Sequence, residues 1–528
     1  MITGKNYVGS TLKAAGNKTF KTFNPQQNVE NPWVFTEATH EEIEEAVALA
    51  HQAFGTYKKY SGLERAGFLN AIADEIVALG NDLLVQYCSE SGFPMGRAEG
   101  ERGRMVGQLR AFAQMLIEGS WVQAAIDTAI TDRVPAPKED LRKILVPLGP
   151  VVVFGSSNFP FAFSTAGGDT ASALAAGCPV IVKSHSMHVG TGEMVASAII
   201  KAAQKTNMPE GVFSNLIGGG TTLGTALVKH PLVKAVGFTG SIRAGRALFD
   251  LAAQRPEPIP VFAEMGSVNP VVLLPNAVKV NSQKWATAYA GSITLGAGQF
   301  CTNPGLLFGI KGAELDKFSE ELTQAIEKIE PFCMLHPSMK NGFEEGSATM
   351  LAQKGVVKIA EYKGDAAPNY GVQKVLTVDG KTFLENKTLS HEVFGPVSVL
   401  VQCDDEQQLL SIINQLDGQL TGTIIGEPEE LKNQDELVAA MQSKVGRLIF
   451  NGVPTGVEVC PSMIHGGPYP ASSDSRFTAV GIHAVYRWVR PFSYQNWPNE
   501  LLPAALQNEN PLQILRTLNN IQTKSQIT

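Results

Sequence analysis

The chain has 528 residues, of which 44% are hydrophobic, and a formal net charge of −7 at pH 7. This length and apolar content predict a large core divided between more than one domain. The charge is modest and forms no long block of one sign, which argues against nucleic acid or an anionic membrane as the main partner. The N-terminus lacks the apolar run of a signal peptide, and no stretch of about 18 apolar residues occurs. We therefore expect a cytoplasmic protein without a membrane-spanning helix.

The first part of the chain is predicted to be mainly helical. Residues 39–54, 63–80 and about 97–118 carry apolar side chains at helical spacing. Thr39 and Glu42 form a candidate capping box at the start of the first helix. Residues 128–148 instead combine proline, charge and a short alternating run. This composition is typical of a hairpin or arm rather than of a core element.

Short apolar strands then alternate with helical segments. Each apolar run is followed by a turn and a helix, as expected for buried parallel strands in βαβ units. A second alternating region covers roughly residues 265–450, and the tail from about 469 ends in a polar segment that either forms an arm or stays mobile. The apolar runs of the first region are 151–154, 180–182, 233–238 and 259–263.

Cys301 is the most informative single residue. It lies within residues 296–305, among glycines and beside a Pro-Gly pair, which predicts a tight turn. Such a turn leaves the sulfur reachable and surrounds it with free amide N–H groups, so we expect a low thiol pKa and a stabilised oxyanion. A buried structural cysteine is the alternative, since all six cysteines are scattered as in a reduced protein.

Three other polar residues follow predicted strands or turns. Glu264 lies on a turn bounded by glycine and proline and is either a general base, a capping carboxylate or half of a salt bridge. Asn158 either donates its amide to an oxyanion or forms an Asx-turn before proline. Lys183 ends a buried strand, at the edge where open α/β sheets bind ligands. His185 and His188 lack a third ligand motif, so no metal site is expected.

A cofactor signal follows the strand at 233–238. Gly240 and Ser241 form a turn that opens a helix, and helix N-termini offer N–H groups to a phosphate. An ordinary serine N-cap is the alternative reading of this turn. No Gly-x-Gly-x-x-Gly fingerprint is present.

Together these segments resemble the aldehyde dehydrogenase superfamily over about residues 20–495. The branch that they resemble most contains α-ketoglutaric semialdehyde (2,5-dioxopentanoate) dehydrogenases and NADP-dependent fatty aldehyde dehydrogenases, on the basis of residues 98–110, 167–179 and 470–477. The superfamily resemblance rests on the ordered motifs Asn158-Phe159-Pro160, Lys183, Phe238-Thr239-Gly240-Ser241, Glu264-Met265-Gly266, Gly298-Gln299-Phe300-Cys301 and Glu392-Val393-Phe394-Gly395-Pro396.

The resemblance implies an α/β fold of three parts. A Rossmann-like cofactor domain is expected at 1–127 and 149–263, and an α/β catalytic domain at 264–468. Residues 128–148 and 469–528 are expected to form a β-hairpin oligomerisation arm with the C-terminal tail. The arm implies a homodimer or homotetramer.

The resemblance also assigns roles. Cys301 is the expected nucleophile, Glu264 the base for deacylation and Asn158 the oxyanion donor. The expected cofactor residues are Lys183 and Ser186 for the adenosine ribose, Gly240, Ser241 and Gly245 for the pyrophosphate turn, and Glu392 and Phe394 for the nicotinamide side. NAD-preferring relatives usually carry glutamate where this chain has Ser186, so NADP is the preferred cofactor by this reading, with NAD possible.

The substrate is expected to be a small aldehyde. The narrower resemblance favours oxidation of 2,5-dioxopentanoate to 2-oxoglutarate, with a medium- or long-chain fatty aldehyde as the alternative. Arg110, Arg476 and Ser473 are conceivable anchors for the acid end. A thiol esterase would leave the cofactor positions without a purpose, and the joint presence of Cys301, Glu264 and Asn158 argues against a non-catalytic protein of the same fold. The residues expected in the substrate pocket are Phe159, Phe163, Phe300 and Thr302.

Overall fold

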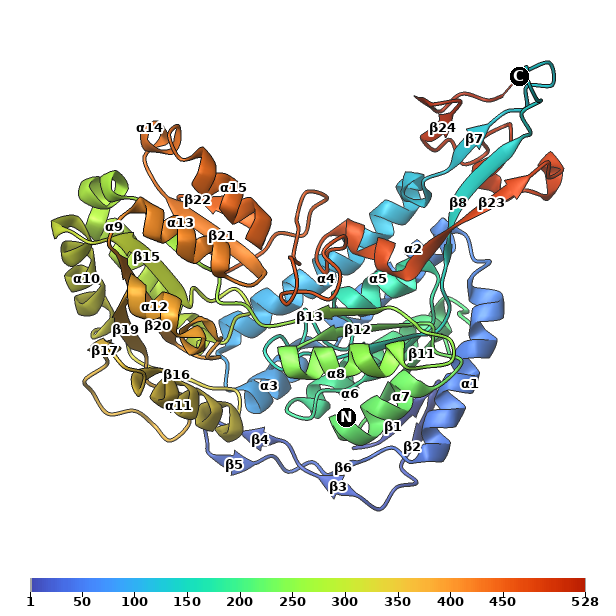
Figure 1. The fold of residues 1–528 in the computed structure, drawn as a ribbon. Coiled ribbons are helices and arrows are strands. Elements are labelled where there is room, and N and C mark those ends of the chain that lie inside the picture. The colour runs from blue at the N-terminus through green and yellow to red at the C-terminus, as the bar shows by residue number, and fades with distance from the viewer. Residues whose placement is uncertain (1, 528) are drawn as a thin grey trace.

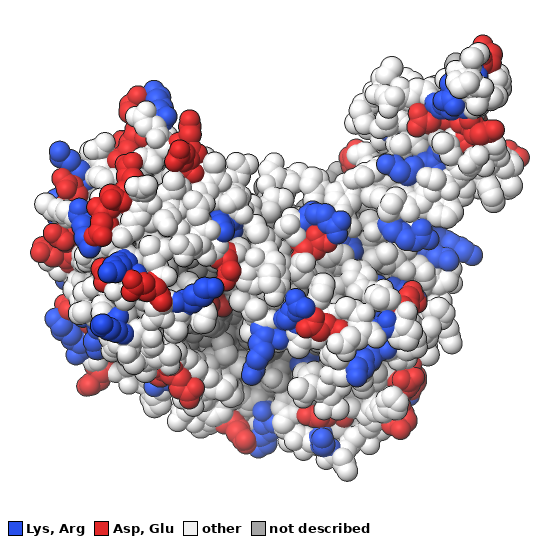
Figure 2. All heavy atoms as spheres, in the orientation of Figure 1, with Lys and Arg blue, Asp and Glu red and all other residues white. Residues whose placement is uncertain are grey.

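The computed structural model describes residues 2–527 and contains two large lobes and a projecting arm (Figure 1). Each lobe is built on a seven-stranded sheet, and a five-stranded sheet forms the arm. The expected α/β architecture is confirmed. The surface view in Figure 2 shows acidic and basic side chains intermixed over both lobes, with a hollow between them. Within residues 2–527 no helix has the length and apolar character needed to cross a bilayer.

The first sheet carries the cofactor signals of the sequence. The five strands from β13 to β11 are parallel, whereas β1 and β2 join antiparallel at the other edge. The sequence did not predict β1, because a three-residue run that begins with Asn6 is too short for a periodic signal. In sheet order the strands are β13 (Val261–Glu264), β12 (Ala235–Thr239), β9 (Val151–Phe154), β10 (Val180–Lys183), β11 (Phe213–Leu216), β1 (Asn6–Val8) and β2 (Thr11–Lys13).

Helices cover both faces of this sheet, which explains why its strands are apolar on both sides. Val151 and Val153 pack into the cluster with α2, α4, α5 and α6, while Val152 packs on the opposite face with α1, α7 and α8. The capping box of Thr39 and Glu42 is present at α1. The helices are α1 (His40–Tyr57), α2 (Gly62–Ala78), α3 (Gly80–Ser91), α4 (Met95–Glu118), α5 (Gly168–Ala176), α6 (Val189–Lys205), α7 (Thr225–Lys229) and α8 (Ile242–Ala253).

The second lobe begins where the chain leaves β13. All neighbouring strands of its sheet are parallel except β17, which pairs antiparallel with β19. Helices again cover both faces. In sheet order the strands are β17 (Val357–Glu361), β19 (Lys374–Asp379), β20 (Val397–Cys403), β15 (Leu306–Ile310), β14 (Val271–Leu273), β21 (Gln419–Ile425) and β22 (Val445–Phe450). The helices are α9 (Pro275–Thr294), α10 (Ala313–Ile326), α11 (Pro337–Leu351), α12 (Gly380–Glu385), α13 (Glu406–Gln415), α14 (Pro428–Leu431) and α15 (Asp435–Lys444).

The arm projects from the first lobe (Figure 1). It includes the expected segment 128–148 and the C-terminal tail, whose last strands extend the sheet. In sheet order its strands are β23 (Val489–Gln495), β8 (Leu141–Pro147), β7 (Ala125–Asp127), β24 (Arg516–Leu518) and β25 (Ile521–Thr523). Short strand pairs elsewhere are β3 (Thr19–Phe20) with β6 (Phe35–Thr36), β4 (Phe23–Asn24) with β5 (Val29–Glu30), and β16 (Phe332–Cys333) with β18 (Tyr370–Gly371).

The predicted start of the arm at residue 469 differs from the structure. Residues 469–488 run back along the first lobe before the arm begins at Val489. The Met265 N–H donates to the Ala471 carbonyl at 2.8 Å, and the Ser473 N–H donates to the Ala263 carbonyl at 2.9 Å. The buried Trp488 indole donates to Ser172 at 2.7 Å. The two main-chain bonds add an edge to β13, a pairing that no local sequence signal marks, and the Trp488 bond holds the end of the segment on α5.

Candidate active site

Cys301 lies on a turn that closes the segment after α9. Gly296, Ala297 and Gly298 all have positive φ, of 55°, 57° and 64°. A Cβ at Gly298 would stand 2.3 Å from the Gly395 carbonyl oxygen, so only glycine fits there. Behind the turn, the buried Asn269 amide donates to the Cys301 carbonyl at 2.9 Å. The turn therefore holds the half-buried thiol at one place between the lobes.

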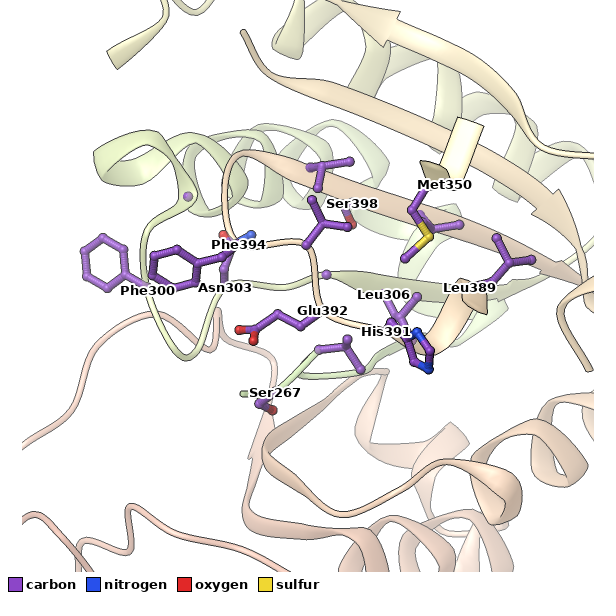
Figure 3. Close-up of a pocket in the computed structure, with 16 residues that line it drawn as sticks. Ser267, Phe300, Asn303, Leu306, Met350, Leu389, His391, Glu392, Phe394 and Ser398 are labelled. Carbon is purple, nitrogen blue, oxygen red and sulfur yellow. The ribbon is translucent and has the colours of Figure 1, made fainter. Parts of the chain in front are cut away.

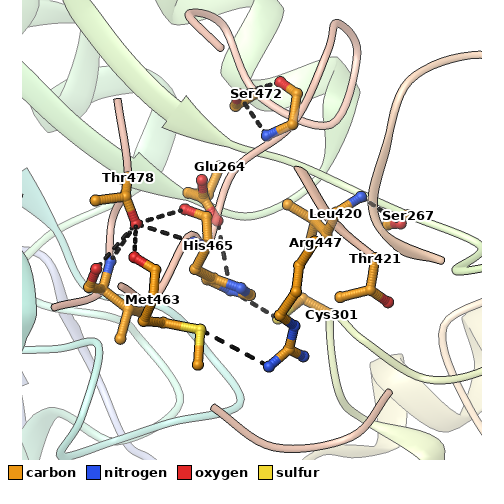
Figure 4. A network of polar contacts seen from close by, with 12 residues as sticks. Glu264, Ser267, Cys301, Leu420, Thr421, Arg447, Met463, His465, Ser472 and Thr478 are labelled. Atoms are coloured by element: carbon orange, nitrogen blue, oxygen red, sulfur yellow. Dashed lines mark hydrogen bonds and ion pairs between the residues drawn. The ribbon is translucent and has the colours of Figure 1, made fainter. Parts of the chain in front are cut away.

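Three side chains from distant segments, Cys301, His465 and Glu264, lie next to one another (Figure 4). Cys301 Sγ lies 3.4 Å from His465 Nε2, and the same nitrogen lies 3.4 Å from Glu264 Oε2. His465 comes from the long connection after β22, where its N–H donates to Thr478 Oγ1 at 2.9 Å. Arg447 fixes the start of that connection by donating to the Pro454 carbonyl at 3.0 Å. The thiol, imidazole and carboxyl groups therefore form one row.

Sequence reasoning did not find His465. The residue stands before Gly466-Gly467-Pro468, a turn signal that says nothing about proximity to a cysteine 164 positions earlier. Only the return of residues 469–488 along β13 brings the histidine to the thiol. The glycines were the one available sign, because Gly467 has the Gln419 carbonyl oxygen 2.2 Å from where a Cβ would stand.

The electrostatic surroundings of Cys301 differ from the expectation. Burial, reinforced by the carboxyl groups of Glu264 and Glu392, raises the pKa of the Cys301 thiol to about 12, against the opposing charge of Arg104. The predicted low thiol pKa is therefore wrong for this arrangement. The turn does supply an N–H group, but desolvation outweighs it. Ionisation of the thiol thus needs a proton acceptor close by.

The two neighbours of the thiol differ in strength as bases, because burial weakens the His465 imidazole as a base and strengthens the Glu264 carboxylate. Burial lowers the pKa of His465 to about 3, with the charges of Arg104 and Arg447 adding to the effect, so the imidazole is neutral near pH 7. Burial raises the pKa of Glu264 well above its usual range. Among residues 2–527, Glu264 Oε2 and His465 Nδ1 have no hydrogen-bond partner. Raised carboxyl pKa values suit a general base that works near neutrality.

Asn158 lies in the loop that follows β9 and is 6% exposed. Its Nδ2 donates to the Gln299 carbonyl at 3.1 Å, and its own carbonyl accepts from Arg97 at 2.9 Å. A carboxamide carries two N–H groups, so one remains for a ligand beside Cys301. The Asn158 side chain is thus held by the loop that carries Cys301, and its main chain is held by Arg97 of α4.

A cavity of about 540 Å³ opens between the lobes, at the carboxyl ends of β9, β10, β12 and β13. Open α/β sheets bind ligands at this edge. Ser241 caps α8 by accepting from the Ala244 N–H at 3.3 Å, which leaves the helix N-terminus facing the cavity. The cavity brings together eight of the residues expected from the sequence, namely Asn158, Lys183, Gly240, Ser241, Glu264, Cys301, Glu392 and Phe394.

The residues of this cavity fit a nicotinamide dinucleotide. Lys183 is nearly buried and, among the residues described, has no carboxylate within 4.0 Å. Burial lowers the pKa of Lys183 to about 8, although Glu37 opposes the shift. An anionic or hydroxyl-rich ligand would relieve that desolvation. The N-terminus of α8 offers the positive end of a helix dipole to a pyrophosphate.

Glu392 closes the cavity from the second lobe (Figure 3). Its carboxyl group points toward Ser267, with the rings of Phe300 and Phe394 on its other side. Burial raises the pKa of Glu392 to about 7, and a backbone hydrogen bond from Ser267 opposes the shift. A Cβ at Gly266 would stand 2.2 Å from Glu392 Oε2, so a larger residue there would displace the carboxyl group from its present position.

Four expected site residues lie outside the cavity walls. Ser186 is exposed beyond β10. Gly245 is buried on α8, where a Cβ would meet Met265 Sδ at 2.7 Å, so its smallness serves helix packing. Thr302 is 2% exposed behind the turn. Phe163 packs against the Phe159 ring, 5.7 Å between centroids, and forms a wall behind His465.

A second cavity, of about 400 Å³, approaches the turn from the other side. Phe159 and Phe300 line it, as expected for a substrate pocket, and each directly adjoins Asn158 or Cys301 in the chain. The three anchors suggested by the sequence are elsewhere. Arg110 pairs with Asp74 on the exposed face of α4, and Arg476 pairs with Asp474 on the surface. The Ser473 hydroxyl accepts from the Ala263 N–H on β13 at 2.9 Å.

No group of three or more His, Cys, Asp or Glu side chains in residues 2–527 is arranged to hold a metal ion. His185 and His188 stack at 5.2 Å between ring centroids. His188 Nε2 lies 2.7 Å from the Ser156 carbonyl, so this ring supports the loop that carries Asn158.

Comparison with known proteins agrees with this geometry. Residues 12–473 match the model of the aldehyde dehydrogenase family. The chain belongs to that family and is an NAD(P)-dependent oxidoreductase that acts on aldehydes.

Two relatives match the whole chain. The sequence is 46% identical to an alpha-ketoglutaric semialdehyde dehydrogenase 2 of Azospirillum brasilense, over 98% of both chains. It is 43% identical to an alpha-ketoglutaric semialdehyde dehydrogenase of Acinetobacter baylyi, over 99% of both chains. Among solved structures, a Thermus 1-pyrroline-5-carboxylate dehydrogenase with bound NAD superposes with a TM-score of 0.79 at 22% identity, and 93% of this chain and 92% of that chain are covered. The structural likeness concerns the fold.

Proposed function

We propose that this enzyme oxidises 2,5-dioxopentanoate to 2-oxoglutarate, with NADP as the preferred acceptor. The row formed by Cys301, His465 and Glu264 is the observation that carries the chemistry. The names of the two full-length relatives support the substrate. A two-sided site, with a nucleotide cleft on one side of the thiol and a separate cavity on the other, suits an acceptor and an aldehyde that approach from opposite directions.

The reaction begins with ionisation of Cys301. The neutral His465 imidazole is the nearest acceptor for the thiol proton, which then leaves to solvent, so Glu264 stays free for the hydrolytic step. The thiolate then adds to the aldehyde carbon and forms a thiohemiacetal, whose oxyanion accepts from the free amide N–H of Asn158. Lys183, Ser241 and Glu392 would hold the nicotinamide dinucleotide, which would supply the hydride acceptor, and Cys301 would then keep the acyl group as a thioester.

Release of the product needs water. Glu264 has one oxygen without a partner, and its raised pKa matches the task of taking a proton from water near neutral pH. Hydrolysis of the thioester gives a free carboxylic acid and restores the thiol. Formation of acyl-CoA at an equal rate when CoA is added would contradict this step.

The proposed preference for NADP rests on the charges around Lys183. Ser186, just beyond this strand end, carries no negative charge, so a 2′-phosphate meets no repulsion there. Lys183 is a buried cation without an ion-pair partner among the residues described. A higher kcat/KM for NAD than for NADP would overturn this part of the proposal.

We assign subunit contacts to the arm. Each of its two outer strands, β23 and β25, has one edge without a neighbouring strand in the sheet. Phe492 on β23 and Ile521 on β25 are 38% and 67% exposed. Open edges with exposed apolar side chains are typical of association surfaces. Light scattering should give the mass of a dimer or tetramer, and the mass of a single chain would contradict the assignment.

The substrate is tested by comparing two aldehydes. We expect kcat/KM for 2,5-dioxopentanoate to exceed that for hexanal at least about tenfold, which corresponds to about 1.4 kcal/mol of transition-state binding. The aromatic rings of the second cavity favour hexanal instead, as for a fatty aldehyde dehydrogenase. A preference for hexanal would therefore replace the proposed substrate with that alternative.

A further inference from the structure

The second cavity contains two arginines that the reaction chemistry does not use. Arg97 and Arg104 project from α4 into the space beside Phe159 and Phe300. They are seven residues apart, with Glu101 between them at four- and three-residue spacings, so all three lie on one face of the helix. This face is the wall of the cavity opposite the turn that carries Cys301.

The Arg104 guanidinium is short of hydrogen-bond acceptors. Its Nε and Nη2 atoms are buried and have no hydrogen-bond partner in residues 2–527. The group lies 5.6 Å from the Phe159 ring centroid and 5.2 Å from that of Phe163. Burial lowers the pKa of Arg104, and the Cys301 thiol is among the groups whose charge it feels. A cation held between aromatic rings without an acceptor is ready for an anionic ligand.

Arg97 is held in place more completely. One of its amino groups, Nη2, donates to the Asn158 carbonyl at 2.9 Å, and the guanidinium lies 3.5 Å from the centroid of Phe93. The other, Nη1, is buried and has no partner among the residues described. Arg97 therefore links the main chain of the oxyanion donor to the cavity and offers one free donor group there.

Glu101 does not neutralise these cations by direct pairing. Its Oε2 accepts from the Tyr87 hydroxyl at 2.6 Å, and its Oε1 accepts from the N–H groups of Phe161 and Ala162 at 2.8 and 3.0 Å. Both oxygens are thus occupied by neutral donors. Glu101 is the acidic residue of the cavity lining and faces both arginines, while the charge of Glu458 also acts on Arg104.

We propose that Arg104, assisted by Nη1 of Arg97, binds the carboxylate of an aldehyde that is also an acid, while the aldehyde carbon reaches Cys301. This inference rests on the proposed function and names the residues that select its substrate class. A carboxylate satisfies the buried donors of Arg104 and pairs with a planar guanidinium through two hydrogen bonds. A neutral aldehyde of similar length leaves those donors unpaired, which is how a polar site rejects an apolar analogue.

Replacement of Arg104 by methionine tests the inference. For Arg104→Met we expect kcat/KM for 2,5-dioxopentanoate to fall roughly 10- to 100-fold, mainly through KM, because a hydrogen bond to a charged group is lost. The value for hexanal should fall by a smaller factor, since hexanal makes no such bond and loses only the effect of the Arg104 charge on the Cys301 thiol. Arg110→Met, on the exposed face of the same helix, is the matched control and should change neither value.

The outcomes separate the anchor from the substrate. A wild-type preference for the acid that survives in Arg104→Met overturns the anchor, as does an equal loss for both aldehydes. If the wild type prefers hexanal, the proposed substrate is wrong, and the anchor is then tested by 2-oxoglutarate inhibition of hexanal oxidation. Inhibition that Arg104→Met abolishes supports the anchor, and inhibition that it retains overturns it. Arg104→Lys keeps the charge but not the planar guanidinium, so its kcat/KM for 2,5-dioxopentanoate should fall less than that of the methionine variant. The same comparison of the two aldehydes is made with Arg104→Lys if Arg104→Met does not fold.

Discussion

The two cavities beside the turn that carries Cys301 are built in different ways. The nucleotide cleft is formed by the ends of neighbouring parallel strands, and each strand delivers one polar group to the same edge. The second cavity is formed by one face of α4, the turn before Cys301 and aromatic rings from the loop after β9. Sheet topology therefore positions the catalytic and cofactor residues, because parallel strands end at the same edge. Selection of the aldehyde instead depends on side chains of one helix, α4.

The largest expected effect removes the thiol, which lines the nucleotide cleft and directly follows Phe300 of the second cavity. Cys301→Ala should lower kcat/KM by more than about 10⁴-fold, because loss of a nucleophile removes the covalent route. NADP binding, measured by quenching of protein fluorescence, should be unchanged, since the cleft is otherwise intact. Cys88→Ala, a half-buried cysteine of α3, is the control and should retain full activity. A Cys301 variant that oxidises aldehyde near the normal rate would sink the mechanism.

Glu264→Gln should separate the two halves of the reaction. Loss of a positioned base lowers the steady-state rate by roughly 10²- to 10⁴-fold. A burst of NADPH close to one per site should persist, because hydride transfer precedes hydrolysis. In the wild type, kcat should rise with pH through the raised pKa of Glu264, since only the ionised carboxyl accepts a proton from water. The variant should lack this inflection, and stopped-flow absorbance records both features. Absence of the burst would place Glu264 before hydride transfer.

The sequence predicted the cleft more fully than the second cavity. Lys183, Ser241 and Glu264 each follow a strand or open a helix, so turn residues beside them mark their positions. Arg104 has no such mark, because an arginine within a long helix is ordinary surface composition until the opposite wall is known. Arg110, on the same helix, was the plausible anchor by sequence and proves to be exposed.

The prediction of a low thiol pKa failed for a related reason. A turn rich in N–H groups is visible in the sequence, but the burial of Cys301 and the approach of Glu392 from the second lobe are not. His465 was missed because its contact depends on residues 469–488 returning along β13. These are long-range effects, and they decide the charge state of the site.

His465→Gln tests what the imidazole between Cys301 and Glu264 contributes to the reaction. We expect kcat to fall roughly 10- to 100-fold, the scale of one lost hydrogen bond to a charged group. Burial keeps the wild-type imidazole neutral above about pH 3, so the loss should be the same throughout the neutral range. Alkylation of Cys301 by iodoacetamide should slow in parallel, because the thiol loses its nearest proton acceptor. Unchanged alkylation with reduced kcat would restrict His465 to positioning Glu264.

The smallest expected effect concerns the edge of the nucleotide cleft. Ser186→Glu places a carboxylate just beyond the strand that ends in Lys183, where a 2′-phosphate is expected. Repulsion of about 1.4 kcal/mol would lower kcat/KM for NADP about tenfold and leave NAD nearly unaffected. Ser186→Gln, of similar size without charge, is the matched control and should change both values little. Raising the salt concentration should shrink the difference, because Ser186 is exposed and its charge would be screened. Equal effects of the glutamate and glutamine variants would mean that shape rather than charge at residue 186 sets the preference.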